Sequence, residues 1–192
     1  MDLTGFGKAE KLPYPYSLED YALEVKRILD FLGIEKVDIV AHSFGARVTV
    51  KLISLGESRI DRIIFTGAAG LKPRRRLSYL LKRASFLLLK NFIKKEKLIK
   101  FYSVDYRNLT LVEKESFKLI VNEHLDGEYK KINSKTLIVF GKKDKSTPPY
   151  MARKIKRYVK NSQLEFIKCT GHFCFVDEYD KFNSLVFSFL FG

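Results

Sequence analysis

Residues Val37–Arg47 read VDIVAHSFGAR and combine a strand pattern with a helix pattern. An apolar run ends at Ser43, a glycine follows two places on, and a helical pattern comes next. A buried strand of a parallel sheet typically reads as such a continuous run of branched apolar residues. The stretch therefore predicts a strand over 37–41, a helix from about 46 to 55, and Ser43 on the tight turn between them.

The same alternation of strand and helix patterns continues along the chain. Apolar runs predict further strands over 62–66, 136–140 and 164–168. Apolar residues at helical spacing predict one helix between Ser17, as its N-cap, and Gly33, and others over 149–159 and 178–190. Strands that alternate with helices predict an α/β fold, in which a parallel sheet is flanked by helices.

The length and composition fit one globular domain. The chain has 192 residues, of which 46% are hydrophobic and 14% aromatic, so it can bury a substantial core. It has no run of about 20 apolar residues that could span a membrane, and its first residues lack the order of a signal peptide. Two cysteines, Cys169 and Cys174, are too few for a disulfide framework. We therefore expect a cytoplasmic protein whose cysteines stay as thiols.

The positive charge of the chain is concentrated in one segment. There are 36 Lys and Arg residues against 22 Asp and Glu residues, which gives a net charge of +14. Between Lys72 and Lys100 the only acidic residue is Glu96, and the apolar residues from 77 to 92 recur at helical spacing. One interpretation is an amphipathic helix that covers the functional cleft and turns its lysines to water.

A second interpretation is that this basic amphipathic helix rests on an anionic membrane surface. Nucleic acid is not an expected partner. The sequence lacks the aromatic RNA-binding signature, the zinc-finger spacing and the helix-turn-helix pattern that would accompany such charge.

The turn at Ser43 has the pattern of a nucleophile elbow. The flanking small residues, Ala41 and Gly45, fit a strained strand-to-helix turn that lifts a serine hydroxyl off the end of the sheet. A simpler interpretation is also open, because serine is a common N-cap and Ser43 precedes a helix. The short pattern alone does not decide between the two.

A serine nucleophile needs a histidine to take its proton and a carboxylate to orient that histidine. His172 lies in the segment CTGHF, directly after the last predicted strand, and Asp144 lies in GKKDKSTP, directly after the strand over 136–140. Loops at the carboxyl ends of parallel strands form the ligand-binding edge of such sheets. The other two histidines, His42 and His124, are expected to be structural or solvated, with His42 pointing away from the site.

A metal site is a further alternative at the same loop. Cys169, His172 and Cys174 are all ligand types and lie within six residues. Structural zinc sites usually combine two separated ligand pairs, and the sequence offers no second pair. We therefore expect no metal and no cofactor here; Cys174 is expected to pack in the loop, and Asp177 with Glu178 to start the last helix.

These segments together resemble the α/β-hydrolase family. The resemblance rests on AHSFG, FGKKDKSTP and GHFCFVDEYDKFN, and on the opening DLTGFGKAE, which is similar to a D-x-x-G-x-G loop of that family. It implies that Ser43 is the nucleophile, His172 the general base and Asp144 its orienting acid. It also implies that the backbone N–H of Phe44 contributes to the oxyanion hole.

The resemblance divides the chain into three parts. Residues 1–70 would be the first part of the core with the elbow, 71–130 a helical cap insertion, and 131–192 the second part of the core. In the family, four strands precede the D-x-x-G-x-G loop, which here begins at the second residue. We therefore expect a core that lacks its first strands, with an exposed edge on the strand over 37–41 and without the second oxyanion donor.

The function implied by the resemblance is hydrolysis of a carboxylic ester through an acyl-enzyme, with a small acyl compound as substrate. Hydrolysis of a carbon–carbon bond uses the same triad and is the runner-up. The alternative outside catalysis is an inactive remnant, or a partner-dependent binding module with a basic cap. An apolar acyl pocket is expected from aromatic residues of the insertion: Phe86, Phe92, Phe101, Tyr102 and Tyr106.

Overall fold

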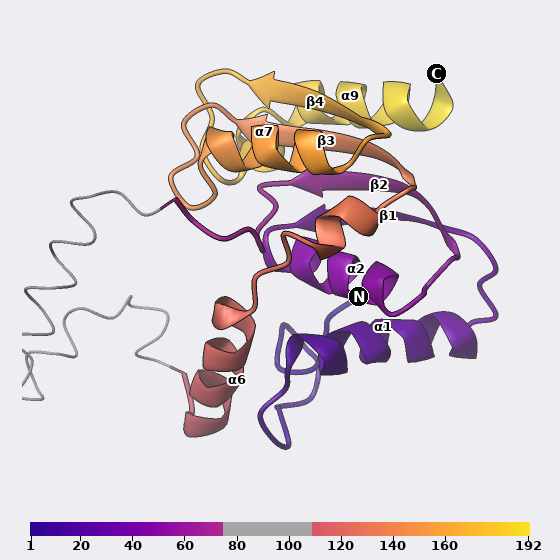
Figure 1. Ribbon diagram of the computed structural model, residues 1–192, viewed down its shortest axis with the longest axis vertical. Coiled ribbons are helices and arrows are strands. Elements are labelled where there is room, and N and C mark those ends of the chain that lie inside the picture. Colours follow the sequence, from indigo (N-terminus) through magenta and orange to yellow (C-terminus); the bar gives the residue numbers. More distant parts are fainter. Residues whose placement is uncertain (75–108) are drawn as a thin grey trace, which may run out of the picture.

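The fold is an α/β sandwich built on a four-stranded parallel sheet (Figure 1). The structure, a computed structural model, describes residues 1–74 and 109–192. Its strands are β1 (Val37–His42), β2 (Ile60–Thr66), β3 (Lys135–Gly141) and β4 (Ser162–Ile167), in the order β1-β2-β3-β4. The predicted fold class and all four predicted strands are confirmed, with strand ends that differ from the prediction by two residues at most.

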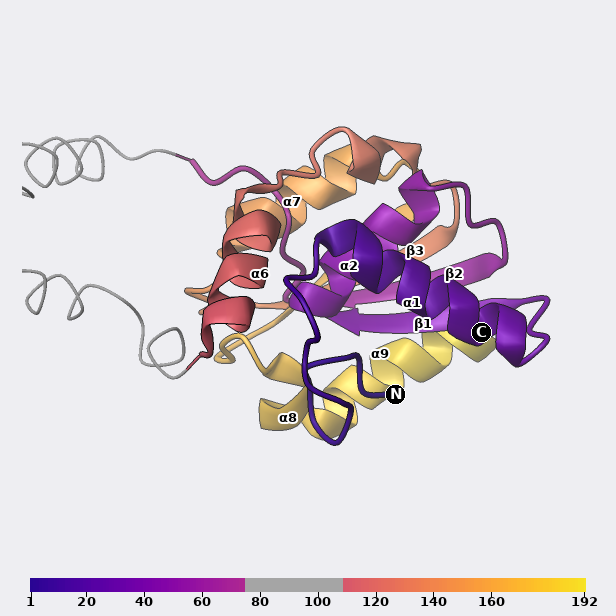
Figure 2. The same cartoon turned by 90° about the horizontal axis from the view of Figure 1, so that it is seen from below.

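Helices cover both faces of the sheet (Figure 2). On one side lie α1 (Leu18–Phe31), α2 (Phe44–Ser54) and α7 (Pro149–Tyr158); on the other lie α8 (Cys174–Asp177) and α9 (Tyr179–Phe191). Because successive strand side chains point to opposite faces, the buried residues form two cores. Phe65 and Phe140 belong to the core under α2 and α7, whereas Ile64 and Val139 pack with Phe182 of α9.

Local sequence signals explain the bounds of α1. Ser17 is its N-cap and forms a capping box with Asp20, in which each side chain accepts from the backbone N–H of the other residue. Gly33 follows the end of the helix with a φ of +61°, a conformation that glycine adopts without a steric cost. Both predicted ends of this helix are confirmed.

The predicted bounds differ from the structure around α2 and in the C-terminal segment. α2 begins at Phe44, two residues earlier than predicted, so that it follows Ser43 directly. Cys174 is not in a loop: it is a fully buried residue of the short helix α8. Asp177 ends α8 and does not start the last helix; its carboxylate accepts from the N–H of Gly171 at 3.3 Å. Glu178 is the N-cap of α9.

The two ends of the predicted insertion meet. The N–H of Leu125 donates to the carbonyl of Gly70 at 2.8 Å, and the N–H of Lys72 donates to the carboxylate of Asp126 at 2.8 Å. Between these stems the structure describes α6 (Leu111–Asn122), and η2 (Glu128–Lys131) follows them. The predicted amphipathic helix over 77–92 and the five predicted pocket aromatics lie outside the described residues.

Two further observations concern surfaces. The outer edge of β1 is unpaired within residues 1–74 and 109–192, and the side chain of Val40 is 57% exposed there. A groove of about 350 Å³ follows this strand and is also lined by Met1 and Leu3. This is the exposed edge that the sequence predicts. None of the helices in the described part of the chain has the length and apolarity to cross a membrane.

Candidate active site

Ser43 occupies a strained turn between β1 and α2. Its φ of 47° and ψ of −102° are unusual for a residue with a side chain, and such a conformation costs on the order of 1–3 kcal/mol. Its N–H donates to the carbonyl of Thr66 at 3.0 Å, and its own carbonyl accepts from Ala69 at 3.2 Å. The side chain makes no capping hydrogen bond. Ser43 therefore does not act as a capping side chain, and the geometry is that of an elbow.

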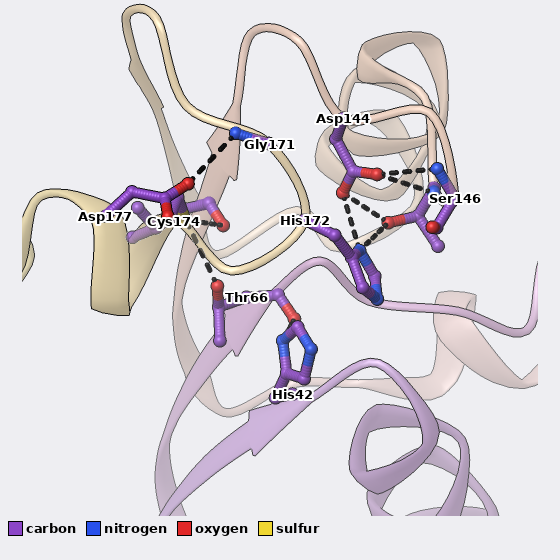
Figure 3. Close-up of polar contacts among 10 residues, drawn as sticks. His42, Thr66, Asp144, Ser146, Gly171, His172, Cys174 and Asp177 are labelled. Atoms are coloured by element: carbon purple, nitrogen blue, oxygen red, sulfur yellow. Dashed lines mark hydrogen bonds and ion pairs between the residues drawn. The ribbon is translucent and has the colours of Figure 1, made fainter.

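Buried Asp144 and half-buried His172 form a pair (Figure 3). The Nδ1–H of His172 donates to Oδ2 of Asp144 at 2.8 Å, although 28 residues separate them in the sequence. The Asp144 side chain is almost fully buried, and its carboxylate also accepts from the N–H of Ser146 at 2.8 Å and from the N–H and hydroxyl of Thr147 at 2.9 and 2.8 Å. These donors compensate for the loss of water around the carboxylate.

The contacts of His172 fix which nitrogen carries its proton. With Nδ1–H directed to Asp144, and with the Thr147 oxygen 3.3 Å from the same nitrogen, the neutral ring leaves Nε2 as an acceptor. The loop that carries His172 passes close to the end of β3. A Cβ at Gly141 would lie 2.1 Å from the carbonyl oxygen of Gly171, so only glycine fits there.

The structure brings Ser43 to the same edge of the sheet as this pair but does not bond it to His172. The Ser43 N–H donates to the carbonyl of Thr66. Gly67, which follows Thr66, lies directly against the His172 ring. Among the hydrogen bonds made by the described residues, none joins the Ser43 hydroxyl to His172. A serine hydroxyl rotates freely, and catalytic hydrogen bonds often shorten only when substrate binds.

Phe44, the predicted oxyanion-hole residue, is the first residue of α2. An N–H at this position has no acceptor within the helix, so it can face an anion beside the serine. The Phe44 ring stacks on Phe6 with centroids 5.3 Å apart and meets Tyr21 edge-on at 5.2 Å. These contacts hold the start of α2 against the opening loop and α1.

A cavity of about 410 Å³ opens beside Ser43. Its charged lining residues are Arg47 and Glu113, and the Arg47 guanidinium already donates to the carbonyls of Ile120 and Glu123 at 2.9 and 2.8 Å. The apolar lining comes from the opening loop, α1, α2, the segment before α6, and α6 itself: Phe6, Leu12, Tyr21, Phe44, Leu109, Phe117, Ile120 and Val121. The pocket aromatics predicted from the sequence lie outside the described residues, so that prediction is not tested by this lining.

Two residues near the site were missed from the sequence. His42 was expected to point away, but its ring centroid lies 4.6 Å from that of His172 (Figure 3). Thr147 contacts both Asp144 and His172. A hydroxyl residue three places after an acid often bonds to its carboxylate locally, and this pattern could have identified Thr147. His124 is exposed, as expected.

The alternative of a metal site at the histidine loop does not match the observed positions. Cys174 is buried with its sulfur 3.4 Å from the hydroxyl of Thr66, whereas Cys169 is exposed. Within residues 1–74 and 109–192, no three His, Cys, Asp or Glu side chains are grouped so that they could hold a metal ion.

Several known proteins with similar sequences over nearly the whole chain are named as hydrolases. The chain is 26% identical over 212 residues to the AB hydrolase superfamily protein YisY of Bacillus subtilis, an alignment that covers 98% of this chain and 79% of that protein. It is 25% identical to a 2-hydroxy-6-oxononadienedioate/2-hydroxy-6-oxononatrienedioate hydrolase of Pseudomonas putida, over 99% of this chain and 75% of the relative.

Solved structures show the same fold. An esterase from Exiguobacterium antarcticum superposes with a TM-score of 0.76 at 24% identity, covering 100% of this chain and 80% of the esterase. A meta-cleavage product hydrolase from Pseudomonas fluorescens superposes with a TM-score of 0.70 at 21% identity, covering 98% of this chain and 77% of the hydrolase. The sequence profile of the alpha/beta hydrolase family matches residues 1–185. The chain belongs to the alpha/beta hydrolase family.

Proposed function

We propose that this chain is a serine hydrolase that cleaves carboxylic esters through an acyl-enzyme. The observation that carries the proposal is the partly buried 2.8 Å hydrogen bond between His172 and Asp144, at the edge of the sheet where the elbow presents Ser43. A histidine oriented by a carboxylate is the arrangement that activates a serine hydroxyl.

In the proposed reaction, Nε2 of His172 accepts the proton of the Ser43 hydroxyl while Oγ attacks the ester carbonyl. The N–H of Phe44 donates to the oxyanion that forms. His172 then returns the proton to the leaving alcohol, which completes the acyl-enzyme. A water molecule, deprotonated by the same nitrogen, attacks the acyl carbonyl and releases the acid with the serine restored.

The cavity beside Ser43 supports a small ester with an apolar acyl group. Its described lining is mainly aromatic and aliphatic, and the guanidinium of Arg47 is occupied by two backbone carbonyls. A buried carboxylate on the substrate would therefore find few donors in this part of the site. An ester of an apolar acid matches these surroundings better than a dianionic compound.

Carbon–carbon bond hydrolysis is the second candidate, because several relatives carry names of that class. One Pseudomonas putida relative is named for a dioate substrate, and another is a 2-hydroxymuconate semialdehyde hydrolase that is 24% identical to this chain. The same three residues would serve both reactions. The apolar cavity favours the ester, and a substrate panel that includes both classes separates them.

The exposed edge of β1 keeps a non-catalytic candidate open, namely a partner-dependent module or an inactive remnant that binds through this edge. We also propose that the basic segment over 72–100 binds an anionic lipid surface, on the strength of its positive charge. The labelling experiment below separates the catalytic from the non-catalytic function.

The purified chain is treated with a fluorophosphonate and its intact mass is measured. We expect one adduct on the wild type and none on Ser43→Ala or His172→Ala. His124→Ala, which changes an exposed histidine, is the matched control and should label like the wild type. A folded wild type without an adduct, or an adduct that persists in Ser43→Ala, contradicts the proposal. Hydrolysis of acyl esters of increasing chain length then tests the substrate class.

A further inference from the structure

His42, directly before the serine, is packed into the catalytic edge. Its ring centroid lies 4.6 Å from that of His172, with 54° between the ring planes (Figure 3). The rings of Phe173 and Phe175 lie 5.2 and 5.0 Å from it on the side of the histidine loop. His42 therefore fills the space between the end of β1 and the loop that carries His172.

A hydrogen bond holds the His42 ring in this place. Its Nδ1 lies 3.1 Å from the carbonyl oxygen of Thr66, the same oxygen that accepts from the N–H of Ser43 at 3.0 Å. Since a carbonyl only accepts, Nδ1 carries a proton and donates it. The orientation of His42 is thus tied to the backbone that shapes the elbow.

The imidazole rings of His42 and His172 both pack against Gly67. A Cβ built on Gly67 would lie 2.9 Å from Cε1 and Nδ1 of His172 and 3.0 Å from Cε1 of His42. Both rings therefore rest directly on backbone, and a shift of one ring toward the glycine is blocked. With Gly67 below and His42 beside it, His172 has little room to rotate away from Asp144.

The charge state of His42 fits this packing. Burial and the neighbouring His172 lower the pKa of His42, while the Thr66 carbonyl and Asp144 act in the opposite direction. These are the polar and titratable groups that face it from β2 and from the loops after β3 and β4. A neutral His42 places no positive charge beside His172, and such a charge would oppose the positive charge that His172 gains when it accepts the serine proton.

We infer that His42 is a positioning residue, whose ring holds the His172 imidazole in line with Asp144 and Ser43 during proton transfer. This inference rests on the proposed serine hydrolase function. It does not make His42 a catalytic residue, because His42 is not among the residues that line the cavity beside Ser43 and acts through His172. The expected role is steric: the ring restricts His172, and the bond to Thr66 restricts the ring.

The test compares His42→Ala, which removes the ring, with His42→Phe, which keeps a ring but loses the hydrogen bond. We expect kcat for an ester to fall about 10- to 100-fold in His42→Ala, since small displacements of reacting groups have effects of this order. KM should change less than about twofold, because His42 does not line the cavity beside Ser43. His42→Phe should recover most of kcat, and His124→Ala should match the wild type.

Nuclear magnetic resonance of the His172 ring nitrogens gives a readout that does not depend on turnover. We expect one tautomer, protonated at Nδ1, in the wild type and averaged signals in a folded His42→Ala. If kcat and these signals are unchanged in His42→Ala, or if only the melting temperature falls, the inference is wrong while the proposed function stands. If the wild type neither labels nor hydrolyses esters, the proposed function is wrong, and the ring signals still decide whether His42 orders His172.

Discussion

Thr147 binds the carboxylate of Asp144 twice. Its backbone N–H lies 2.9 Å from Oδ1 and its hydroxyl lies 2.8 Å from Oδ2. The hydroxyl is also 3.3 Å from Nδ1 of His172, so one side chain holds both members of the pair. Donors of its own loop therefore hold the Asp144 carboxylate in place independently of its hydrogen bond with His172.

Replacement of this hydroxyl gives the first prediction. Thr147→Val keeps the shape of the side chain but leaves a nearly buried carboxylate oxygen with one donor fewer. We expect the free energy of unfolding, measured in urea, to fall by about 1–3 kcal/mol, and kcat to fall with it. Thr147→Ser retains the hydroxyl and should restore both values. A valine variant with wild-type stability and kcat would contradict this role.

Loss of charge on the acid should affect catalysis far more than stability. Asp144→Asn replaces the acceptor of the His172 Nδ1–H by an amide, which favours the wrong tautomer. In a chymotrypsin-type triad the matching change lowers kcat by about 10⁴-fold, and we expect a loss of that order here. Steady-state ester hydrolysis measures it. Asp180→Asn, at an exposed acid of α9, is the control and should keep most of the activity.

Stability should depend on pH through Glu57. The guanidinium of Arg59 donates to both carboxylate oxygens, at 2.7 and 2.6 Å, and lowers the pKa of Glu57 from 4.5 to about 2. Because the pKa is lower in the folded state, this stabilisation is fully present above 4.5 and is lost as the pH falls toward 2. Glu57→Gln should therefore remove part of the acid dependence.

Urea unfolding of the wild type and Glu57→Gln, from about pH 6 to about pH 2, measures this difference. The two proteins should differ most at the neutral end and converge at the acid end. Glu35→Gln, at an exposed acid, is the control and should follow the wild type. Parallel curves for the wild type and Glu57→Gln would show that the ion pair does not contribute.

Arg47 should hold α6 onto the core. Its guanidinium donates to the carbonyls of Ile120 and Glu123 at the end of that helix, and burial lowers its pKa. Arg47→Met leaves these carbonyls without their donor, which should cost about 1–3 kcal/mol in the free energy of unfolding. Hydrogen exchange should become faster in α6 and stay unchanged in α9. The exposed Arg27→Met is the control, and equal exchange in all three proteins would contradict the anchoring role.

The cavity should set the length of acyl chain that the enzyme accepts. Ala69 lines the cavity beside Ser43. Its N–H donates to the carbonyl of Ser43 and its carbonyl accepts from the Tyr129 hydroxyl, so a larger side chain leaves both backbone hydrogen bonds available. Ala69→Phe should fill part of the space, so kcat/KM should fall for octanoyl esters and stay near the wild-type value for acetyl esters. The acetyl ester is the internal control. An equal fall in kcat/KM for both esters would show that the acyl chain does not occupy this cavity.

Much of the core follows from local sequence. Ser17 and Asp20 specify the start of α1, and the strands read as apolar runs because both faces of the sheet are buried. Asp144 and His172 could be predicted because the ends of parallel strands share one edge. The contact of His42 with His172 could not be predicted from the sequence. The two residues are 130 positions apart, and their rings meet because both pack against Gly67. The α6 helix carries a readable signal, a capping box between Thr110 and Glu113.

The junction of Gly70 with Leu125 has a consequence for how this protein can change. The core is tied to the insertion at its two ends, where Leu125 binds Gly70, and through α6, where Arg47 binds the carbonyls of Ile120 and Glu123. The cost of closing a loop rises slowly with its length, so residues gained or lost between Lys72 and the start of α6 should change the stability of the core little. The length of that stretch can therefore change in evolution while α6 and the edge of the sheet that carries Ser43, Asp144 and His172 stay in place.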